Sequence, residues 1–419
     1  MAETRNYRGA LATVTTLFFM WGFLTSLNDI LVPHLKSIFD LNYAEVMLIQ
    51  FAFFSAYFIF SLPSGRLIDR IGYKKAMVAG LLTMGIGALL FIPAAAVPSF
   101  PLFLGALIIL AAGITLLQVA ANPYVTVLGP ADTASSRLNL TQAFNSLGTT
   151  VAPYFGSLVI LSAAPKTSEE MRRMSSQVLQ AYRLHQASSV KLPYLGLGLA
   201  LLLLGVFIAK VKLPAIPEAV RSSSSHTAGQ SVWKYRHLVL GAVAIFVYVG
   251  AEVAIGSFLV SYLGQPSIGN LPANIAARFV SVYWGGAMIG RFIGSGVLQR
   301  VRTGAVLAVA AVGACLLVVI SIATTGHVAM WTILLVGLCN SIMFPSIFAL
   351  GVAGLGPLTG DGSGVLVMAI VGGAIIPEIQ GALADHIGIH YALALPALCY
   401  IYILYYALRG SRPAATASA

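Results

Sequence analysis

The sequence predicts an all-α membrane protein with twelve transmembrane helices in two bundles of six. Hydrophobic residues make up 58% of its 419 residues and charged residues only 9%. An ordinary soluble domain has about 25% charged residues. Continuous apolar stretches, each of the roughly 20 residues that span a bilayer, recur along the chain. A polar segment divides them six and six. These observations exclude a soluble enzyme, a nucleic-acid-binding module, a disordered chain and a β-barrel, whose strands alternate apolar and polar residues.

The predicted spans follow one another in order. In the first half they cover residues 10–32, 44–66, 76–96, 101–128, 138–162 and 192–212. In the second half they cover residues 236–263, 275–299, 304–325, 329–352, 362–384 and 388–409. Residues 213–235 are polar and rich in Pro and Ser, which is typical of a linker. We therefore expect an N-terminal bundle (1–212), a cytoplasmic linker (213–235) and a C-terminal bundle (236–419).

The basic residues predict the orientation of the spans. With both termini inside, 16 of the 24 Lys and Arg lie on the inner side and 7 on the outer side, and Arg291 lies within a span. Five of the seven outer residues belong to one longer loop, about 163–191. Inner loops of membrane proteins carry such an excess of positive charge. The first apolar run lacks a small-residue cleavage site, so we expect no cleaved signal peptide.

Several kinds of chemistry find no support in the sequence. The three cysteines lie in apolar runs and show no disulfide or metal-ligand spacing. His386 and His390 are four residues apart, but a third ligand is missing, so we expect no metal site. A phosphate-binding glycine-rich loop is absent, so ATP does not power the protein. We expect no bound cofactor and no enzymatic activity.

The two halves share the spacing of their prolines and glycines. Pro123 precedes Gly129 by six residues, and Pro345 precedes Gly351 by six. This shared spacing indicates an internal repeat of six spans. Parallel repeats of this kind place their binding site near the membrane midplane, between the halves.

Acidic residues within the spans are functional candidates because a charge at the bilayer centre costs about 2.5–3.5 kcal/mol. Asp29 and Glu252 hold equivalent places in the repeat, one in the first helix of each half. A carboxyl in such a place can carry a proton in one state and release it in another, and we predict that both acids couple transport to protons. The alternatives are a structural hydrogen bond from Asn28 to Asp29 and a structural ion pair of Glu252 with a residue such as Arg291. The role of a third acid, Glu378, stays open.

Amide side chains gather in the fourth and fifth spans, at Gln118, Asn122, Asn139, Gln142 and Asn145. Their spacings of three and four residues place neighbours on one helix face. Amides both donate and accept hydrogen bonds, which suits a ligand rich in hydroxyl groups. Aromatic side chains in the spans could stack on a sugar ring, and these include Trp21, Tyr57 and Trp284. The alternatives are hydrogen bonds between helices for the amides and packing for the aromatic residues.

The loop between the second and third spans reads Gly65-Arg66-Leu67-Ile68-Asp69-Arg70-Ile71-Gly72-Tyr73-Lys74-Lys75. It resembles the G-x-L-x-D-R-x-G-x-K-K loop of major facilitator transporters. The resemblance implies the major facilitator fold. It also implies a gating loop, formed by Gly65, Asp69, Arg70 and Gly72, that latches the halves in the outward-facing state. The alternative is a positively charged inner loop with no gating role.

Three longer motifs resemble the fucose–galactose–glucose:proton symporter family: WGFLTSLNDIL (21–31), QVAANPYVTVLGP (118–130) and RLNLTQAFNSLG (137–148). In its fucose branch, a glutamate takes the place of Gln118 and a glutamine that of Glu252. The chain is more similar to the glucose/galactose branch. The resemblance implies a coupling role for Asp29 and sugar contacts from Asn122 and Gln142.

The function expected from these observations is proton-coupled symport of a monosaccharide such as glucose, galactose or mannose, by alternating access. We expect a monomer in contact with membrane lipid in a bacterial inner membrane, with no nucleic-acid partner. The alternatives are a sodium-coupled hexose or N-acetylglucosamine symporter and a proton-driven exporter of drugs or lipids. The expected substrate-binding residues are Trp21, Asn28, Gln118, Asn122, Gln142, Asn145, Glu252 and Trp284.

Overall fold

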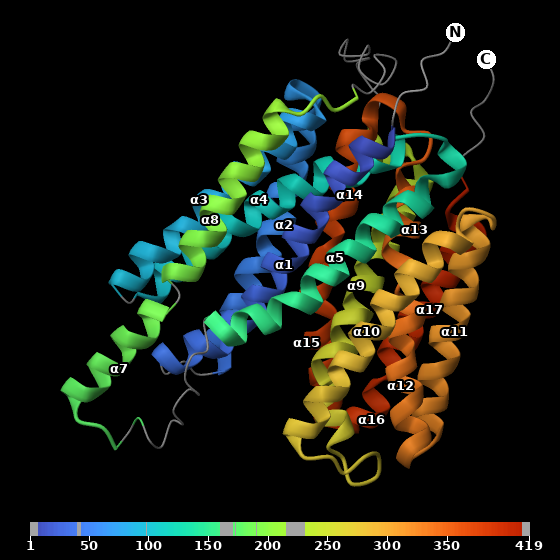
Figure 1. Cartoon of the computed structure of the whole chain (residues 1–419). Coiled ribbons are helices and arrows are strands. Elements are labelled where there is room, and N and C mark those ends of the chain that lie inside the picture. Colours follow the sequence, from blue (N-terminus) through green and yellow to red (C-terminus); the bar gives the residue numbers. More distant parts are fainter. Residues whose placement is uncertain are drawn as a thin grey trace, which may run out of the picture.

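The computed structural model describes residues 7–39, 43–97, 99–159, 171, 173–189, 191–214 and 231–412. The side chains of residues 27–48, 50, 153–159, 185–187, 189 and 273–274 lie outside the described part. All regular elements in the described ranges are helices, as the sequence predicts (Figure 1). The predicted linker falls largely outside these ranges.

The described residues of the first half form six long helices and one shorter one. They are α1 (Tyr7–Phe39), α2 (Tyr43–Ile71), α3 (Tyr73–Ala96), α4 (Phe100–Val127), α5 (Ala134–Val159), α7 (Ser176–Ser189) and α8 (Lys191–Lys210). Helix α3 packs on α4 and α8, α1 packs on α5, and α2 packs on α4. Helix α7 lies in the long loop, where the sequence analysis expected no regular structure.

The second half begins with three unbroken long helices and continues with three spans built from shorter pieces. The unbroken helices are α9 (Arg236–Leu263), α10 (Ala273–Val297) and α11 (Thr303–Ala323). The pieces are α12 (Gly326–Asn340) with α13 (Met343–Val352), α14 (Thr359–Met368) with α15 (Gly372–Ile387), and α16 (Ile389–Ala392) with α17 (Ala394–Tyr405). Helix α9 packs on α15, α13 and α17, at the centre of this half.

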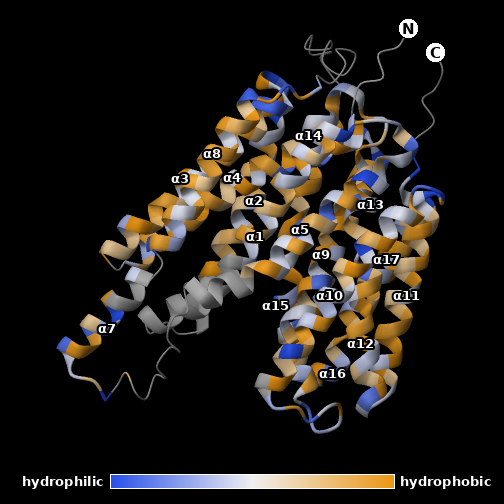
Figure 2. Cartoon of the chain, viewed as in Figure 1, coloured by the Kyte–Doolittle hydropathy of each residue, from blue (hydrophilic) through white to orange (hydrophobic). Residues whose placement is uncertain are grey.

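The helices match the predicted spans to within a few residues at most ends. Ten stretches of the described chain are long and apolar enough to cross a membrane. Helices α5 and α10 run beside them and complete the twelve predicted spans (Figure 1). Apolar residues run along the helices, and hydrophilic residues gather mainly at their ends (Figure 2). Large apolar side chains such as Leu203 and Val309 are exposed, which is expected of lipid-facing positions.

A proline explains the break in the tenth span. Pro345 has no N–H, so the carbonyl of Ser341, four residues earlier, receives no hydrogen bond within the helix. Helix α12 ends at Asn340 and α13 begins at Met343. In the other half, α4 continues through Pro123, and the carbonyl left without its helical partner is that of Val119.

The two halves meet at the end of the molecule that holds the start of α1 and the end of α17, which we call the terminal end, and they diverge away from it (Figure 1). One interface joins α2 to α14. A Cβ added to Gly65 would lie 2.8 Å from the Gly360 carbonyl oxygen, and one added to Gly364 would lie 2.8 Å from the Ser61 carbonyl oxygen. Ser363 on α14 donates a hydrogen bond of 2.9 Å to the Val119 carbonyl. The carbonyl released by Pro123 is thus bound by the other half.

A second interface joins α5 to α10 and is held by polar side chains. Ser136 donates to the Ser295 carbonyl on α10 at 2.6 Å, and next to it Thr303, the first residue of α11, donates to the Ser135 hydroxyl at 2.9 Å. We call this the α5–α10 seam. Together with the contact of α2 and α14, it closes the terminal end of the structure.

Candidate functional site

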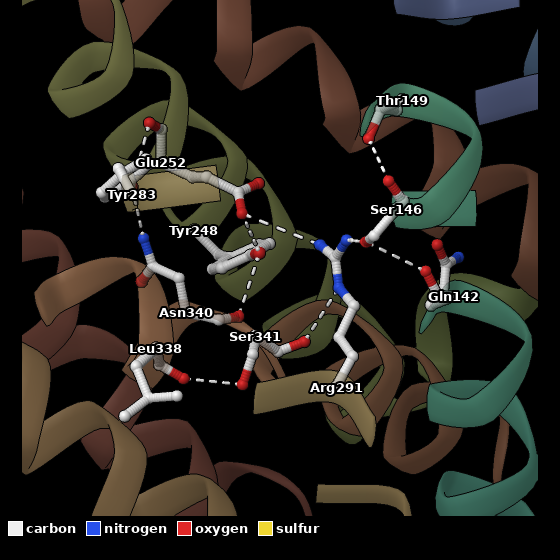
Figure 3. Close-up of polar contacts among 10 residues, drawn as sticks. All are labelled: Gln142, Ser146, Thr149, Tyr248, Glu252, Tyr283, Arg291, Leu338, Asn340 and Ser341. Carbon is white, nitrogen blue, oxygen red and sulfur yellow. Dashed lines mark hydrogen bonds and ion pairs between the residues drawn. The ribbon is translucent and has the colours of Figure 1, made fainter. Parts of the chain in front are cut away.

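Glu252 lies on α9 in the interior of the second half, with 9% of its surface exposed. Tyr248, one helical turn earlier, donates its hydroxyl to Glu252 Oε1 at 2.7 Å (Figure 3). The Arg291 guanidinium on α10 lies 3.9 Å from the same oxygen. The ion pair that the sequence analysis named as an alternative for Glu252 is therefore present. Its length places it beyond hydrogen-bond range, so the Tyr248 hydroxyl is the closer partner.

The break between α12 and α13 supplies backbone acceptors to this site. Arg291 Nε donates to the Ser341 carbonyl at 3.2 Å, which is the carbonyl released by Pro345. The Tyr248 hydroxyl also lies 3.1 Å from the Asn340 carbonyl oxygen. A continuous helix would use these carbonyls internally, so the break is what makes them available to side chains.

Two further tyrosines close the site on the inner side of the second half. Asn340 Nδ2 donates to the Tyr283 hydroxyl at 2.8 Å, and that hydroxyl lies 3.4 Å from the Glu252 carbonyl oxygen. Tyr400 on α17 is buried close enough to interact electrostatically with Glu252. Its hydroxyl also lies beside the Asn340 side chain, without a short hydrogen bond between them. Several polar side chains of the second half therefore surround Glu252.

Arg291 joins this site to the first half. Its Nη1 donates to the Ser146 hydroxyl on α5, and that hydroxyl donates to the Gln142 carbonyl at 3.2 Å (Figure 3). Asn139 on α5 donates to the Arg291 carbonyl at 2.6 Å. Arg291 thus holds α5 through its side chain and through its backbone.

The amides of the first half form a buried group opposite Arg291. Gln118 Nε2 donates to the Tyr57 hydroxyl on α2 at 2.7 Å. Gln142 Nε2 lies 3.5 Å from Asn122 Oδ1, and Asn122 Nδ2 has no partner. Amide groups from α4 and α5 therefore converge, as the spacing predicted.

The other predicted residues lie apart from this group. Asn145 donates to the Phe18 carbonyl on α1 at 2.9 Å, a hydrogen bond between helices. Trp21 is buried against Phe18, with ring centroids 4.7 Å apart. Trp284 is 39% exposed and packs on Tyr283. The side chains of Asn28 and Asp29 lie outside the described residues, so their predicted roles stay predictions.

The predicted gating loop lies where α2 meets α14. The carboxylate of Asp69 lies so close to Gly360 that a Cβ there would be 2.5 Å from Asp69 Oδ1. Asp69 also interacts electrostatically with Asp361. Gly72 adopts φ 81° between α2 and α3, a conformation that favours glycine, and Arg70 is exposed. Gly65 and Asp69 are therefore contacts between the halves.

Sequence reasoning named Arg291 as a partner of Glu252 but missed the other residues that surround it. Tyr248 was detectable, since residues four apart on a helix are neighbours. Asn340 and Ser341 carried the signal of the Pro345 break. Nothing in the sequence pattern distinguished Ser146 from the amide residues beside it. Within the described residues, no group of three or more His, Cys, Asp or Glu side chains gathers as metal ligands. The arrangement can bind a solute with many hydroxyl groups beside a buried carboxyl.

The chain is similar to known proteins in both sequence and structure. The family model described as Major Facilitator Superfamily matches residues 13–377. The chain is 55% identical over 411 residues to a glucose/galactose transporter of Brucella abortus, covering 98% of this chain and 96% of that one. It is 38% identical to the L-fucose-proton symporter of Escherichia coli, covering 97% and 94%. The crystal structure of FucP in the outward conformation matches with TM-score 0.87 at 37% identity, covering 96% of this chain and 99% of FucP.

Proposed function

Because the chain belongs to the Major Facilitator Superfamily, we propose that it is a secondary transporter that carries a monosaccharide and a proton together across the membrane. The observation that carries this proposal is that Arg291, which pairs with the buried Glu252, is bound from the first half by the buried amide of Asn139 and by Ser146. Solute binding between two halves that close at one end fits alternating access.

The amide group argues for a hydroxyl-rich substrate. Asn122 Nδ2 is a buried donor without a partner, and Tyr57 holds the Gln118 amide in one orientation. A sugar hydroxyl can accept from one amide and donate to another. Glucose and galactose are the proposed substrates, since the relative at 55% identity is named for them and the L-fucose symporter is more distant.

Two carboxyls are proposed to bind and release the transported proton: Asp29 in the first half and Glu252 in the second. A neutral carboxyl removes the charge that would oppose closure of a dry cavity. Glu252 has a hydroxyl donor and a cation beside it in this structure. Gaining a proton would change the balance of contacts at the interface of the halves.

The orientation proposed is that of a bacterial inner-membrane protein with both termini in the cytoplasm. The terminal end would then be the cytoplasmic end, and the structure would be closed to the cytoplasm and outward-facing. The similar FucP structure is described as outward. The protein is proposed to act as a monomer surrounded by lipid.

Uptake into proteoliposomes tests the proposal. D-glucose and D-galactose should accumulate under an inward proton gradient, more strongly than L-fucose. Asp29→Asn should abolish accumulation while leaving exchange of sugar across the membrane. Glu252→Gln should weaken uptake. A sodium gradient at fixed pH serves as the control for the driving ion, and accumulation driven by sodium alone would overturn proton coupling.

A further inference from the structure

Arg291 touches both the buried acid and the opposite half. Its three guanidinium nitrogens have partners on three elements: the Ser341 carbonyl at the α12–α13 break, Glu252 on α9 and Ser146 on α5 (Figure 3). The first two belong to the second half and the third to the first half. Arg291 therefore connects the charge of Glu252 with the α5–α10 seam.

The charge balance around Arg291 depends on Glu252. The described titratable groups that bear on Glu252 are Tyr248 on its own helix, Tyr283 and Arg291 on α10, and Tyr400 on α17. The tyrosines are neutral at ordinary pH, so Arg291 is the fixed charge among these groups. The other partners of its guanidinium, Ser146 and the Ser341 carbonyl, are neutral. Glu252 is thus its counter-charge within the described contacts.

A proton on Glu252 would leave the Arg291 cation without its counter-charge. The Arg291 side chain is only 12% exposed, and an unpaired buried charge is strongly unfavourable. The guanidinium lies at the interface of the halves, so it can regain water by leaving Ser146. That movement breaks a contact between α5 and α10.

We propose that Arg291 is a positioning residue of the coupled reaction: it holds α5 to α10 while Glu252 is charged and releases α5 when Glu252 gains a proton. This inference rests on the proposed function, because it assigns the way in which the proton reaches the interface of the halves. It also names Ser146, rather than an acid, as the receiving group on α5.

The test measures the distance across the seam without using transport. Spin labels are placed at Ala131 and Gln299, which are exposed near the terminal ends of α5 and α10. The background lacks Cys315, Cys339 and Cys399. In the wild type we expect a single short distance at pH 7.5 and an added longer one at pH 5.5. Glu252→Gln should show the longer distance at pH 7.5 as well.

Two serines on α5 provide a matched comparison. Ser146→Ala should raise the fraction of molecules with the longer distance, the separated population, about tenfold, as expected for loss of a hydrogen bond to a charged group. Adding Glu252→Gln to Ser146→Ala should then change that fraction no further. Ser136 also bonds α10 but has no link to Glu252. Ser136→Ala should raise the separated population at every pH and add to the effect of Glu252→Gln.

Arg291 itself is tested with a charge-balanced variant, since Arg291→Gln alone leaves Glu252 unpaired. The variant with both Arg291→Gln and Glu252→Gln should fold and elute as a single species in size-exclusion chromatography. Its separated population should be the same at both pH values. Additive effects of Ser146→Ala and Glu252→Gln, or pH dependence that survives in the double variant, would overturn the inference. If the distances behave as expected but the protein does not take up sugar, the proposed function alone is overturned.

Discussion

Replacing Ser363 with alanine should shift the protein away from the closed terminal end. Pro123 deprives the Val119 carbonyl of its helical donor, and Ser363 from the other half supplies one at 2.9 Å. Both residues have no exposed surface. In Ser363→Ala the carbonyl stays buried without a partner, which costs about 1–3 kcal/mol. The cost falls only on the state in which the halves touch here, because the carbonyl can bind water once they part.

The expected size of the shift follows directly. A cost of about 1–3 kcal/mol changes the ratio of the two states by about 5–150-fold. Labelling of a single cysteine placed in the α2–α14 interface, for example at Ser64, measures the open fraction from the terminal side. Thr359→Ala is the matched control, since Thr359 bonds the Gly356 carbonyl within its own segment. Equal labelling of Ser363→Ala and wild type, or an equal rise in the control, would refute the argument.

Two further variants probe the substrate group and the packing of the second half. Tyr57→Phe removes the acceptor of the Gln118 amide, so the concentration of sugar for half-maximal uptake should rise up to about tenfold, and an unchanged value would separate Tyr57 from binding. A Cβ at Gly250 would overlap Ile376, so Gly250→Ala should destabilise the protein by about 1–3 kcal/mol and lower its melting temperature in detergent. Gly285→Ala, at a position with open space, is the control and should melt as the wild type does.

The helices could be predicted because span length and apolar composition are local properties. That Gln118 and Asn122 share one face of α4 was also predictable, since it follows from the spacing of four residues. The bridge from Arg291 to Ser146 was not, because residues 145 positions apart meet only through the packing of the halves. Helix α7 was missed because the segment is polar, and apolar length was the signal used for helices.

Some predicted roles differ from the contacts observed for physical reasons. Asn145 lies three residues after Gln142, which leaves about 60° between the two side chains around α5, and its amide turns to α1, where it bonds the Phe18 carbonyl. Spacing alone places a side chain on a face and does not say which neighbour that face meets. Asp29 and Glu252 hold equivalent places in the repeat. The contacts of Glu252 therefore indicate which kinds of partner to look for around Asp29.

The carbonyls released by prolines have a consequence for the passage between states. Three of them are bound by another helix: Val119 by Ser363, Ser341 by Arg291, and Thr149, four residues before Pro153, by Ser26 at 3.1 Å. A small displacement of any of these helices strands a peptide oxygen before water can reach it. Of the three, the Val119 bond crosses between the halves, so an arrangement in which the halves have only begun to part is costly, and the molecule is expected to move between discrete docked states. Such behaviour suppresses leakage, because a pathway open to both sides of the membrane would strand the Val119 oxygen.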